Sequence, residues 1–387
     1  MSMYAFSERE ALELLERHQT PFFAYRLERA RERFIELRSL LPPRVELAYA
    51  VKANPGLPLL KLFSSLGSSF DCASAGELKA LQEAGGCSSL ILFAGPGKSE
   101  ADLQAALAAG ARIQVDGIED VERLDRLLAE EGRDEPLAVN LRVHPASGIE
   151  EGSRIIGGSG PSAFGVDEEN IARFLLELAP FTRVRIAGLQ VFASSNERNA
   201  DSLLSNHRKA LDIGRQLTEA FGLALEYIDL GGGLGIPYAD TEAPLNVQAL
   251  AEGLAVVLEA NPWFNGRLVL EPGRWLAGPC GVYLSKVLRT KNSRGSDFAI
   301  LEGGINHLLR PLLTGQPFPC AAPGLRGARR DYILAGPLCT SLDRIGLAHA
   351  PQLKAGDALM FGQAGAYGRT EAMSDFLSHP RPAEYWL

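Results

Sequence analysis

The sequence predicts an α/β protein in two parts, a (β/α)8 barrel followed by a mostly antiparallel β-domain. Short apolar runs rich in β-branched residues alternate with segments in which leucine and alanine recur every three or four residues, the pattern of amphipathic helices. The runs, between residues 45 and 272, are VELAYAVKA, SSFDCAS, LILFAG, RIQVDG, LAVNLRV, IAGLQVFA, LEYIDLGGG and LVLEP. Strands that alternate with helices pair in parallel through right-handed crossovers, and this number of units fits a closed barrel better than an open sheet. Because periodicity does not show closure, an open doubly wound sheet remains the alternative.

The second part begins where the long helices stop. After Glu271 the runs GVYLSKVLRTK, DFAILEGG, RDYILAGPLC and ALMFGQ are separated by Gly, Pro, Asn or Asp, which is typical of antiparallel strands. An early strand-like run, TPFFAYRL at residues 20–27, could join the same sheet. We therefore predict the barrel at residues 28–270 and the β-domain at residues 1–27 and 271–387. The Gly/Ser-rich stretch 148–165 is predicted to be a mobile loop after the fifth barrel strand.

Composition and charge exclude several classes of function. The 387 residues carry a formal net charge of −8 and a pI of about 5.5, which provides no basic surface for nucleic acid or anionic membranes. The N-terminal residues lack the basic segment and apolar core of a signal peptide, and no apolar run is long enough to span a bilayer, so we expect a cytoplasmic protein. Five cysteines without a CxxC pair and six dispersed histidines predict neither a disulfide framework nor a metal site.

A single lysine interrupts the first predicted strand. Lys52, in AYAVKANP, lies at the carboxyl end of that strand, where the functional residues of such barrels gather. Partial desolvation there would make the amine a usable nucleophile for a carbonyl group. On this residue alone, a solvated lysine at a strand end is the alternative.

Two further motifs follow the last two predicted barrel strands. In DLGGGLGIPY, residues 229–238, four glycines in five positions let backbone N–H groups approach a phosphate, although a plain tight turn would look the same. In LVLEPGRWL, Glu271 and Arg274 could hold a pyridinium nitrogen and a phosphate, or they could form one salt bridge. A strand-end lysine, a phosphate-type loop and a carboxylate in one barrel mouth together indicate pyridoxal 5′-phosphate (PLP).

These motifs resemble those of the fold-type III PLP-dependent decarboxylases, the group of diaminopimelate and ornithine decarboxylases, over essentially the whole chain. The matching segments are, in order, AYAVKANP, FDCASAGEL, GGGLGIPY, EPGR, GPLCTSLDRI and GAYG. The resemblance implies a PLP-binding barrel of the alanine-racemase type, a β-domain built from both chain ends, and α-decarboxylation of a small amino-acid substrate. It also implies a homodimer with active sites at the subunit interface. A racemase on the same fold is disfavoured, because alanine racemases pair the pyridine nitrogen with arginine rather than with an acid such as Glu271.

The resemblance implies roles for individual residues. Lys52 would be the Schiff-base lysine, Glu271 the acid on the pyridine nitrogen, and Cys339 the group that the neighbouring subunit supplies to protonate the substrate α-carbon. The other positions carried over are charged groups near the cofactor (Asp71, Glu77, Arg142), the phosphate site (Ser195, Gly231, Gly232, Gly233, Gly235, Gly273, Arg274, Tyr367) and substrate contacts (Arg310, Thr340, Asp343).

Three departures from the family pattern concern the active site. Phe192 stands where a histidine usually stacks on the cofactor ring, so stacking is retained but proton transfer is not. Ala163 replaces the lysine before Phe-Gly. Thr340 replaces the Glu or Asp that pairs with the distal ammonium of diaminopimelate or ornithine, and an unpaired ammonium in a closed site is costly. The pattern resembles the branch that decarboxylates conjugated amino acids in siderophore or antibiotic synthesis.

We therefore predict decarboxylation of a conjugated amino acid, such as a citryl-diaminopropionate, with Arg310 on a distal carboxylate. A carrier-protein-tethered amino acid and diaminopimelate are the alternatives. A non-catalytic regulator on the same fold is disfavoured, because Lys52, the glycine loop and Cys339 are all retained. Arg369, Glu371 and Asp375 could line the distal pocket or lie on the solvated surface.

Overall fold

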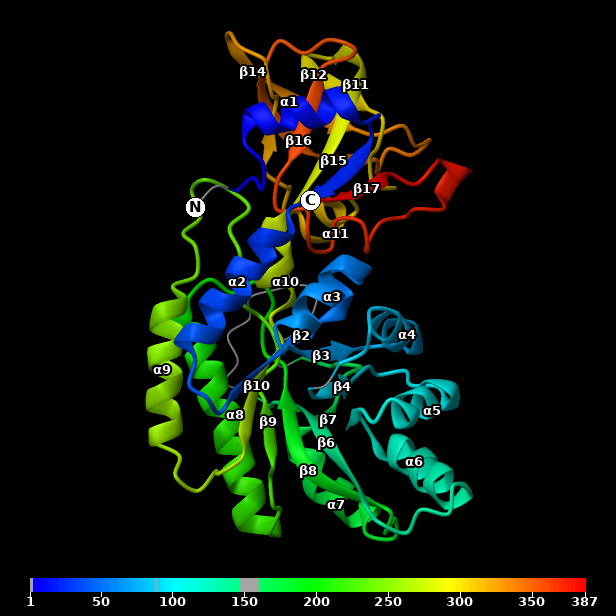
Figure 1. The fold of residues 1–387 in the computed structure, drawn as a ribbon, viewed down its shortest axis with the longest axis vertical. Coiled ribbons are helices and arrows are strands. Elements are labelled where there is room, and N and C mark those ends of the chain that lie inside the picture. Colours follow the sequence, from blue (N-terminus) through cyan, green and yellow to red (C-terminus); the bar gives the residue numbers. More distant parts are fainter. Residues whose placement is uncertain (1–2, 88, 147–159) are drawn as a thin grey trace. The chain divides into compact units, whose positions relative to one another are not determined.

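The computed structural model describes residues 3–87, 89–146 and 160–387 (Figure 1). They form two compact units: a barrel unit of Phe34–Gly235 and Leu245–Gly273, and a β unit of the residues up to Arg33, Ile236–Pro244 and Arg274–Leu387. The domain limits predicted at residues 28 and 270 stay proposals. The predicted mobile loop falls mostly on residues 147–159, outside the described residues. Of the described helices, none is long and apolar enough to cross a membrane.

The predicted closed barrel is confirmed for the described residues. Neighbouring strands pair in parallel in the order β5-β4-β3-β2-β10-β9-β8-β6, and β5 pairs with β6 through Gln114 and Asn140, which closes the circle. The strands are β2 (Val45–Ala50), β3 (Ser69–Cys72), β4 (Ile91–Phe93), β5 (Arg112–Val115), β6 (Leu137–His144), β8 (Val184–Val191), β9 (Tyr227–Asp229) and β10 (Arg267–Leu270), and a short β7 (Val166–Asp167) adds to β6. The open sheet is therefore wrong.

Helices cover the outside of the barrel, as the periodicity predicts (Figure 1). They are α2 (Leu27–Leu40), which begins in the β unit, α3 (Leu57–Ser65), α4 (Ala75–Glu83), α5 (Glu100–Ala108), α6 (Ile118–Glu130), α7 (Ile171–Leu178), α8 (Ala200–Phe221) and α9 (Val247–Glu259). Side-chain oxygens of Ser74, Ser99, Asn199 and Asn246 accept backbone N–H groups in the first turns of α4, α5, α8 and α9. These caps fix where each helix begins after its loop.

Buried polar side chains inside the barrel distinguish it from an ordinary apolar core. Parallel strands covered on both faces are normally almost wholly apolar. Here several strands contribute polar or charged residues that are less than a tenth exposed: Asp71, Gln114, Asn140, Arg142, Gln190 and Asp229. Because buried polar groups are unfavourable unless partnered, this set marks the part of the barrel where function is to be sought.

The β unit is a mostly antiparallel sheet, as predicted. Its main path runs β13-β16-β11-β12-β14-β15, and only the β12–β14 and β1–β17 pairs among the described strands are parallel. The strands are β1 (Phe22–Tyr25), β11 (Gly281–Ser293), β12 (Ser296–Leu301), β13 (Cys320–Ala321), β14 (Arg329–Ala335), β15 (Arg344–Pro351), β16 (Ala358–Phe361) and β17 (Ala383–Trp386), with helices α1 (Glu8–Arg17), α10 (Gly273–Ala277) and α11 (Arg310–Thr314). The early strand-like run does join this sheet, because β1 pairs with β11.

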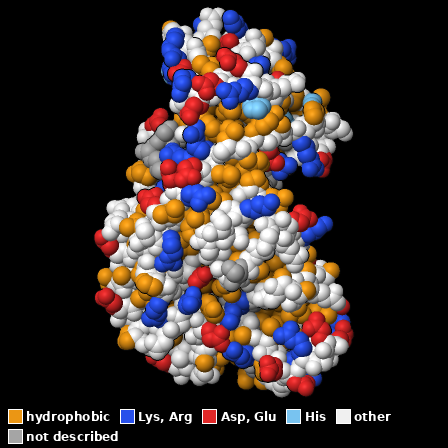
Figure 2. Space-filling model, viewed as in Figure 1, with side chains coloured by type: hydrophobic (Ala, Val, Ile, Leu, Met, Phe, Trp, Pro, Cys, Tyr) orange, Lys and Arg blue, Asp and Glu red, His pale blue; other side chains and the backbone are white. Residues whose placement is uncertain are grey.

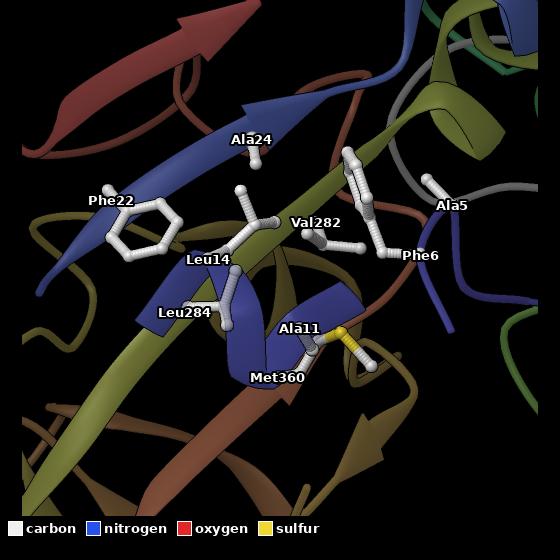
Figure 3. Close-up of a cluster of buried hydrophobic side chains, with 9 residues drawn as sticks. All are labelled: Ala5, Phe6, Ala11, Leu14, Phe22, Ala24, Val282, Leu284 and Met360. Atoms are coloured by element: carbon white, nitrogen blue, oxygen red, sulfur yellow. The ribbon is translucent and has the colours of Figure 1, made fainter. Parts of the chain in front are cut away.

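A compact apolar cluster ties the N-terminal segment to this sheet (Figure 3). Helix α1 places Ala11 and Leu14 against side chains of β1, β11 and β16, among them Val282 and Met360. Burying a leucine, valine or methionine side chain contributes about 1.5–3 kcal/mol to the free energy of unfolding. The N-terminal segment is therefore integral to the β unit.

The visible surface carries charges of both signs. In Figure 2, acidic and basic side chains are interspersed over the helices of the barrel unit. The ion pairs on helices include i,i+4 pairs such as Lys79 with Glu83 on α4 and Arg173 with Glu177 on α7. Exposed pairs of this kind contribute little to stability.

Candidate active site

The amine of Lys52 lies at the carboxyl end of the barrel, beside a buried acid. Strand β2 ends at Ala50, and Lys52 sits in the single helical turn that follows, Val51–Ala53. Its Nζ is 3.1 Å from Oδ2 of Asp71 on the neighbouring strand β3, and the Asp71 side chain is 1% exposed. Asn54 ends the turn by accepting the backbone N–H of Gly56 at 2.9 Å. The sequence thus positions an amine at the mouth rather than inside a strand.

Glu77, the second acid predicted from this motif, begins helix α4. Its carboxylate accepts the backbone N–H of Ala73 at 2.7 Å, which holds it over the end of β3. Burial raises its pKa to about 7; the Ala73 hydrogen bond and Lys52 oppose that rise, and Asp71 adds to it. Glu77 therefore titrates near neutrality in the protein alone.

Glu271 follows β10 and is 3% exposed. Its backbone N–H donates to the carbonyl of Gly231 at 2.8 Å, so the acid is tied to the glycine loop. Burial and the nearby Asp71 raise the pKa of its carboxyl, while Lys52 and Arg142 oppose the rise. Its Oε1 has no hydrogen-bond partner among the described residues. A buried carboxylate oxygen that accepts no hydrogen bond from the protein is suited to a cationic N–H donor of a bound group.

The glycine loop after β9 leaves no room for side chains. A Cβ on Gly231 would lie 2.7 Å from the Phe192 ring, and one on Gly232 would lie 2.7 Å from the carbonyl oxygen of Glu271. Gly233 has φ +91°, and a Cβ there would meet the carbonyl oxygen of Ser194 at 2.9 Å. One on Gly235 would lie 2.6 Å from the backbone of the β8–α8 loop, next to the half-buried Ser195. The backbone is therefore packed as closely as a phosphate-binding loop requires.

Phe192 and Arg142 line the mouth from two other strands. Phe192 directly follows β8, and its ring centroid is 6.0 Å from Nζ of Lys52. Arg142 on β6 is 8% exposed, stacks over Phe164 at 4.4 Å and lies 3.8 Å from Oδ1 of Asp116. Ala163, next to Phe164, is exposed. The predicted aromatic ring and guanidinium both lie at strand ends.

Sequence reasoning missed Asp229, the last residue of β9, which is fully buried. Its Oδ1 accepts the backbone N–H of Gly231 at 2.8 Å and its Oδ2 accepts Nε2 of Gln114 at 2.8 Å. Its carboxyl group also lies beside that of Glu271, and each influences the pKa of the other. An acid directly before a glycine run was the available signal.

The β unit holds a second group of predicted residues around two buried arginines. Arg274 donates to the hydroxyl of Tyr238 at 2.8 Å and stacks over Tyr367 at 4.5 Å. Arg310 is 3% exposed, and its Nε and Nη1 have no hydrogen-bond partner among the described residues; Oε2 of Glu371 is 3.9 Å away. Burial lowers the pKa of Arg310 and raises that of Glu371. Two buried guanidinium groups beside one carboxyl that makes no hydrogen bond to them have the charge and the donors that fit an anion.

The β14–β15 loop carries the remaining candidates. Cys339 is exposed, and the Thr340 hydroxyl accepts the backbone N–H of Leu342 at 3.3 Å. Asp343 is 3% exposed, and its two oxygens accept the backbone N–H groups of Ile305 and Leu338 at 2.8 and 2.7 Å. Both oxygens of the Asp343 carboxylate therefore hold two loops together by hydrogen bonds. The predicted contact of Asp343 with the substrate stays a prediction.

In the barrel unit the structure brings together Lys52, Asp71, Phe192, Glu271 and the glycine loop. Their chemistry fits PLP: an amine for its aldehyde, an open carboxylate oxygen for its ring nitrogen, and closely packed glycines for its phosphate. Among the described residues, no group of three or more His, Cys, Asp or Glu is arranged for a metal ion. Glu77, Arg142, Ser195 and Gly273 also belong to the barrel unit, whereas Arg274, Tyr367, Arg310, Cys339, Thr340 and Asp343 belong to the β unit.

This arrangement defines a PLP-dependent enzyme, and comparison with known proteins gives its family. The family model for the pyridoxal-binding domain of pyridoxal-dependent decarboxylases matches residues 27–278, about two thirds of the chain. This protein belongs to the pyridoxal-dependent decarboxylases, and PLP is its cofactor. It is an amino-acid decarboxylase, and the predicted resemblance to the fold-type III group is confirmed.

Its relatives act on different amino acids. The L-glutamyl-[BtrI acyl-carrier protein] decarboxylase of Niallia circulans is 30% identical over 389 residues, covering 97% of this chain and 90% of the relative. Diaminopimelate decarboxylase of Pseudomonas aeruginosa is 32% identical over 391 residues, covering 98% and 90%. The crystal structure of diaminopimelate decarboxylase from Helicobacter pylori complexed with L-lysine matches with a TM-score of 0.88 at 26% identity, covering 97% of this chain and 94% of that chain.

Proposed function

We propose that this decarboxylase acts on an α-amino acid whose distal end is conjugated and carries no free ammonium, such as a citryl-diaminopropionate made in siderophore synthesis. The observation that carries this proposal is Thr340. It follows Cys339 directly, and it offers a hydroxyl that already accepts a backbone N–H where a charged partner for an ammonium is expected. Leaving an ammonium unpaired in a closed site would cost about 1–3 kcal/mol or more.

Arg310 supports a distal carboxylate on the substrate. Its guanidinium is buried, has two nitrogens without hydrogen-bond partners among the described residues, and faces the carboxyl of Glu371 only at 3.9 Å. An incoming carboxylate could form the paired hydrogen bonds that this guanidinium lacks. A citryl group supplies such a carboxylate, as does diaminopimelate, whereas ornithine and lysine do not, so Arg310 argues against the latter two and Thr340 against all three.

The residues divide the reaction as follows. Lys52 would hold the cofactor through its aldehyde, and Glu271 would hold the protonated ring nitrogen. When bound, PLP supplies an electron sink for the pair that the departing CO₂ leaves at the α-carbon. Cys339, from the second subunit of the proposed homodimer, then donates the proton that replaces the carboxylate. Phe192 would offer an aromatic face to the ring, and it has no group that could take part in proton transfer.

A carrier-bound glutamyl substrate is the second candidate, favoured by the relative from Niallia circulans, whose name states that activity. For α-decarboxylation the carrier must be attached through the distal carboxyl, so this substrate also lacks a distal ammonium. It offers Arg310 no distal carboxylate either. The two candidates therefore differ in what they require of Arg310.

Two substitutions test the proposal. Thr340→Glu should lower kcat/KM for the citryl conjugate about 10- to 100-fold and create turnover of free diaminopimelate, with Thr340→Ser as the matched control. Arg310→Met should raise KM for the citryl conjugate about 10- to 100-fold, whereas Arg381→Met, at an exposed position of the same unit, should not. If Arg310→Met leaves the citryl conjugate unaffected but the carrier-bound substrate is turned over, the second candidate is correct.

A further inference from the structure

Asp229 is a buried acid to which the reaction described above gives no task. It is fully buried at the end of β9, and each of its oxygens already accepts a hydrogen bond, from Gly231 N–H and from Nε2 of Gln114. Its third contact is with the carboxyl group of Glu271. Gln114 is itself fully buried, so water does not replace these contacts.

Two carboxyl groups can share a hydrogen bond only if one of them carries a proton, because carboxylates have no donor. The groups around the pair decide which one. Asp229 faces two acids, Glu271 after β10 and Asp71 on β3, and the neutral amide of Gln114 on β5. Glu271 has the cations Lys52 and Arg142 nearby. Burial raises the pKa of both acids, and of the two Asp229 is raised well above its ordinary range. The surrounding charges therefore favour the proton on Asp229 and the negative charge on Glu271.

We propose that Asp229 is a positioning residue that acts as a neutral acid, donating its proton to Glu271 so that Glu271 remains a carboxylate directed at the pyridine nitrogen. The same side chain accepts from Gly231, whose carbonyl accepts the N–H of Glu271. One carboxyl group thus orients the ring-nitrogen partner and the first residue of the glycine loop together. The inference depends on Glu271 meeting the pyridine nitrogen and is independent of which amino acid is decarboxylated.

The test compares Asp229→Asn with Asp229→Ala. Asparagine retains a donor for Glu271 and an acceptor for Gly231 but cannot ionise, whereas alanine has neither. PLP affinity of the apoprotein, measured by titration, should stay within about threefold of wild type for Asp229→Asn and fall at least about tenfold for Asp229→Ala. The absorbance of the bound cofactor should depend on pH in the same way in Asp229→Asn as in the wild type, and in a different way in Asp229→Ala. Both readouts need no substrate, so they fail or succeed separately from the substrate proposal.

Stability against pH provides a second measurement on the apoprotein. A carboxyl that stays protonated when folded but ionises when unfolded makes the wild type lose stability as pH rises above about 4. The unfolding equilibrium constant of Asp229→Asn relative to wild type should therefore fall by up to tenfold per pH unit between pH 5 and 8. Infrared spectra should show a protonated-acid carbonyl band in the wild type that Asp229→Asn lacks.

An ionised Asp229 would overturn the inference, and it has a distinct signature. Asp229→Asn would then lose PLP affinity as Asp229→Ala does, its stability relative to wild type would not change with pH, and the infrared band would be absent from the wild type. If Asp229→Ala does not fold, the stability and infrared comparisons of Asp229→Asn with wild type decide the matter alone.

Discussion

Glu77 shows how a single side chain is retuned by its position. The sequence predicts an acid near the cofactor, but not that it lies half-buried at the start of α4 beside Asp71 and Lys52. Burial raises its pKa to about 7. In the unfolded chain the same carboxyl titrates at about pH 4.3.

The raised pKa of Glu77 predicts a pH-dependent stability. Between about pH 4.3 and 7 the unfolded state has lost the Glu77 proton and the folded state has not, so unfolding becomes easier as pH rises. Above pH 7 both states are ionised and the loss levels off. Relative to Glu77→Gln, the apoprotein should lose about 1–2 kcal/mol of unfolding free energy from pH 5 to pH 8, a value reduced for the partial exposure of the group.

Denaturant unfolding at several pH values measures this difference. Glu83→Gln, at an exposed position on the same helix, is the matched control and should parallel the wild type. Parallel curves for Glu77→Gln and wild type would mean that Glu77 titrates as an ordinary surface acid.

At the scale of residues, the sequence predicts those site residues that directly follow a predicted strand. Lys52 and Glu271 were predicted because each directly follows a recognisable strand. Asp229 was missed because its partner Gln114 lies on β5, far away in the sequence, and only closure of the barrel brings the two strands within reach. Local pattern carries no information on such pairs.

At the scale of elements, the turn between β9 and the following segment depends on glycine. Gly233 has φ +91°, and a Cβ there would lie 2.9 Å from the Ser194 carbonyl oxygen. Gly222, which ends helix α8 with φ +68°, has open space around the Cβ position. The two glycines therefore share the backbone requirement but differ in crowding.

This difference predicts unequal effects of alanine. Gly222→Ala should lower the unfolding free energy by about 1 kcal/mol through backbone strain alone. Gly233→Ala should lower it by about 2–4 kcal/mol and weaken PLP binding at least about tenfold, because the loop must move. Chemical denaturation and PLP titration of both variants measure this. Wild-type PLP affinity in Gly233→Ala would show that the loop does not hold the phosphate.

At the scale of the whole molecule, the alternation of strands and helices together with the number of units predicted a closed barrel, and the structure confirms it. Alternation predicts parallel pairing of successive strands but does not say whether the first strand meets the last, and it is the β2–β10 pairing that joins them and closes the barrel. Residues 236–244, which the sequence places within the barrel, belong to the β unit, where Tyr238 receives the Arg274 hydrogen bond. A short segment without a strand or helix gives no signal of such a crossing.

The β unit exposes large apolar side chains that a second copy of the chain could cover. They include Leu312, Leu313, Leu342, Leu347, Met373, Phe376 and Leu377. Burial of such side chains would be favourable in a subunit interface. In the proposed homodimer, Cys339 of one subunit serves the Lys52 of the other.

That arrangement predicts complementation between two inactive variants. Lys52→Ala and Cys339→Ala should each have little activity, but dissociated and reassociated together they should recover about a quarter of the wild-type rate, because half of the dimers are mixed and each contains one intact site. Each variant treated alone is the control. An inactive mixture that contains mixed dimers would mean that both residues serve the same subunit's site.

The central claim is that the substrate is distally conjugated, and CO₂ release by the PLP-loaded enzyme tests it most directly. The panel is meso-diaminopimelate, L-ornithine, L-lysine, L-arginine, L-glutamate, citryl-conjugated L-2,3-diaminopropionate and a carrier-bound glutamyl group. We predict release from a conjugate alone, with the citryl compound preferred. Robust release from free diaminopimelate would contradict the account, since some group other than the residue after Cys339 would then pair with the distal ammonium.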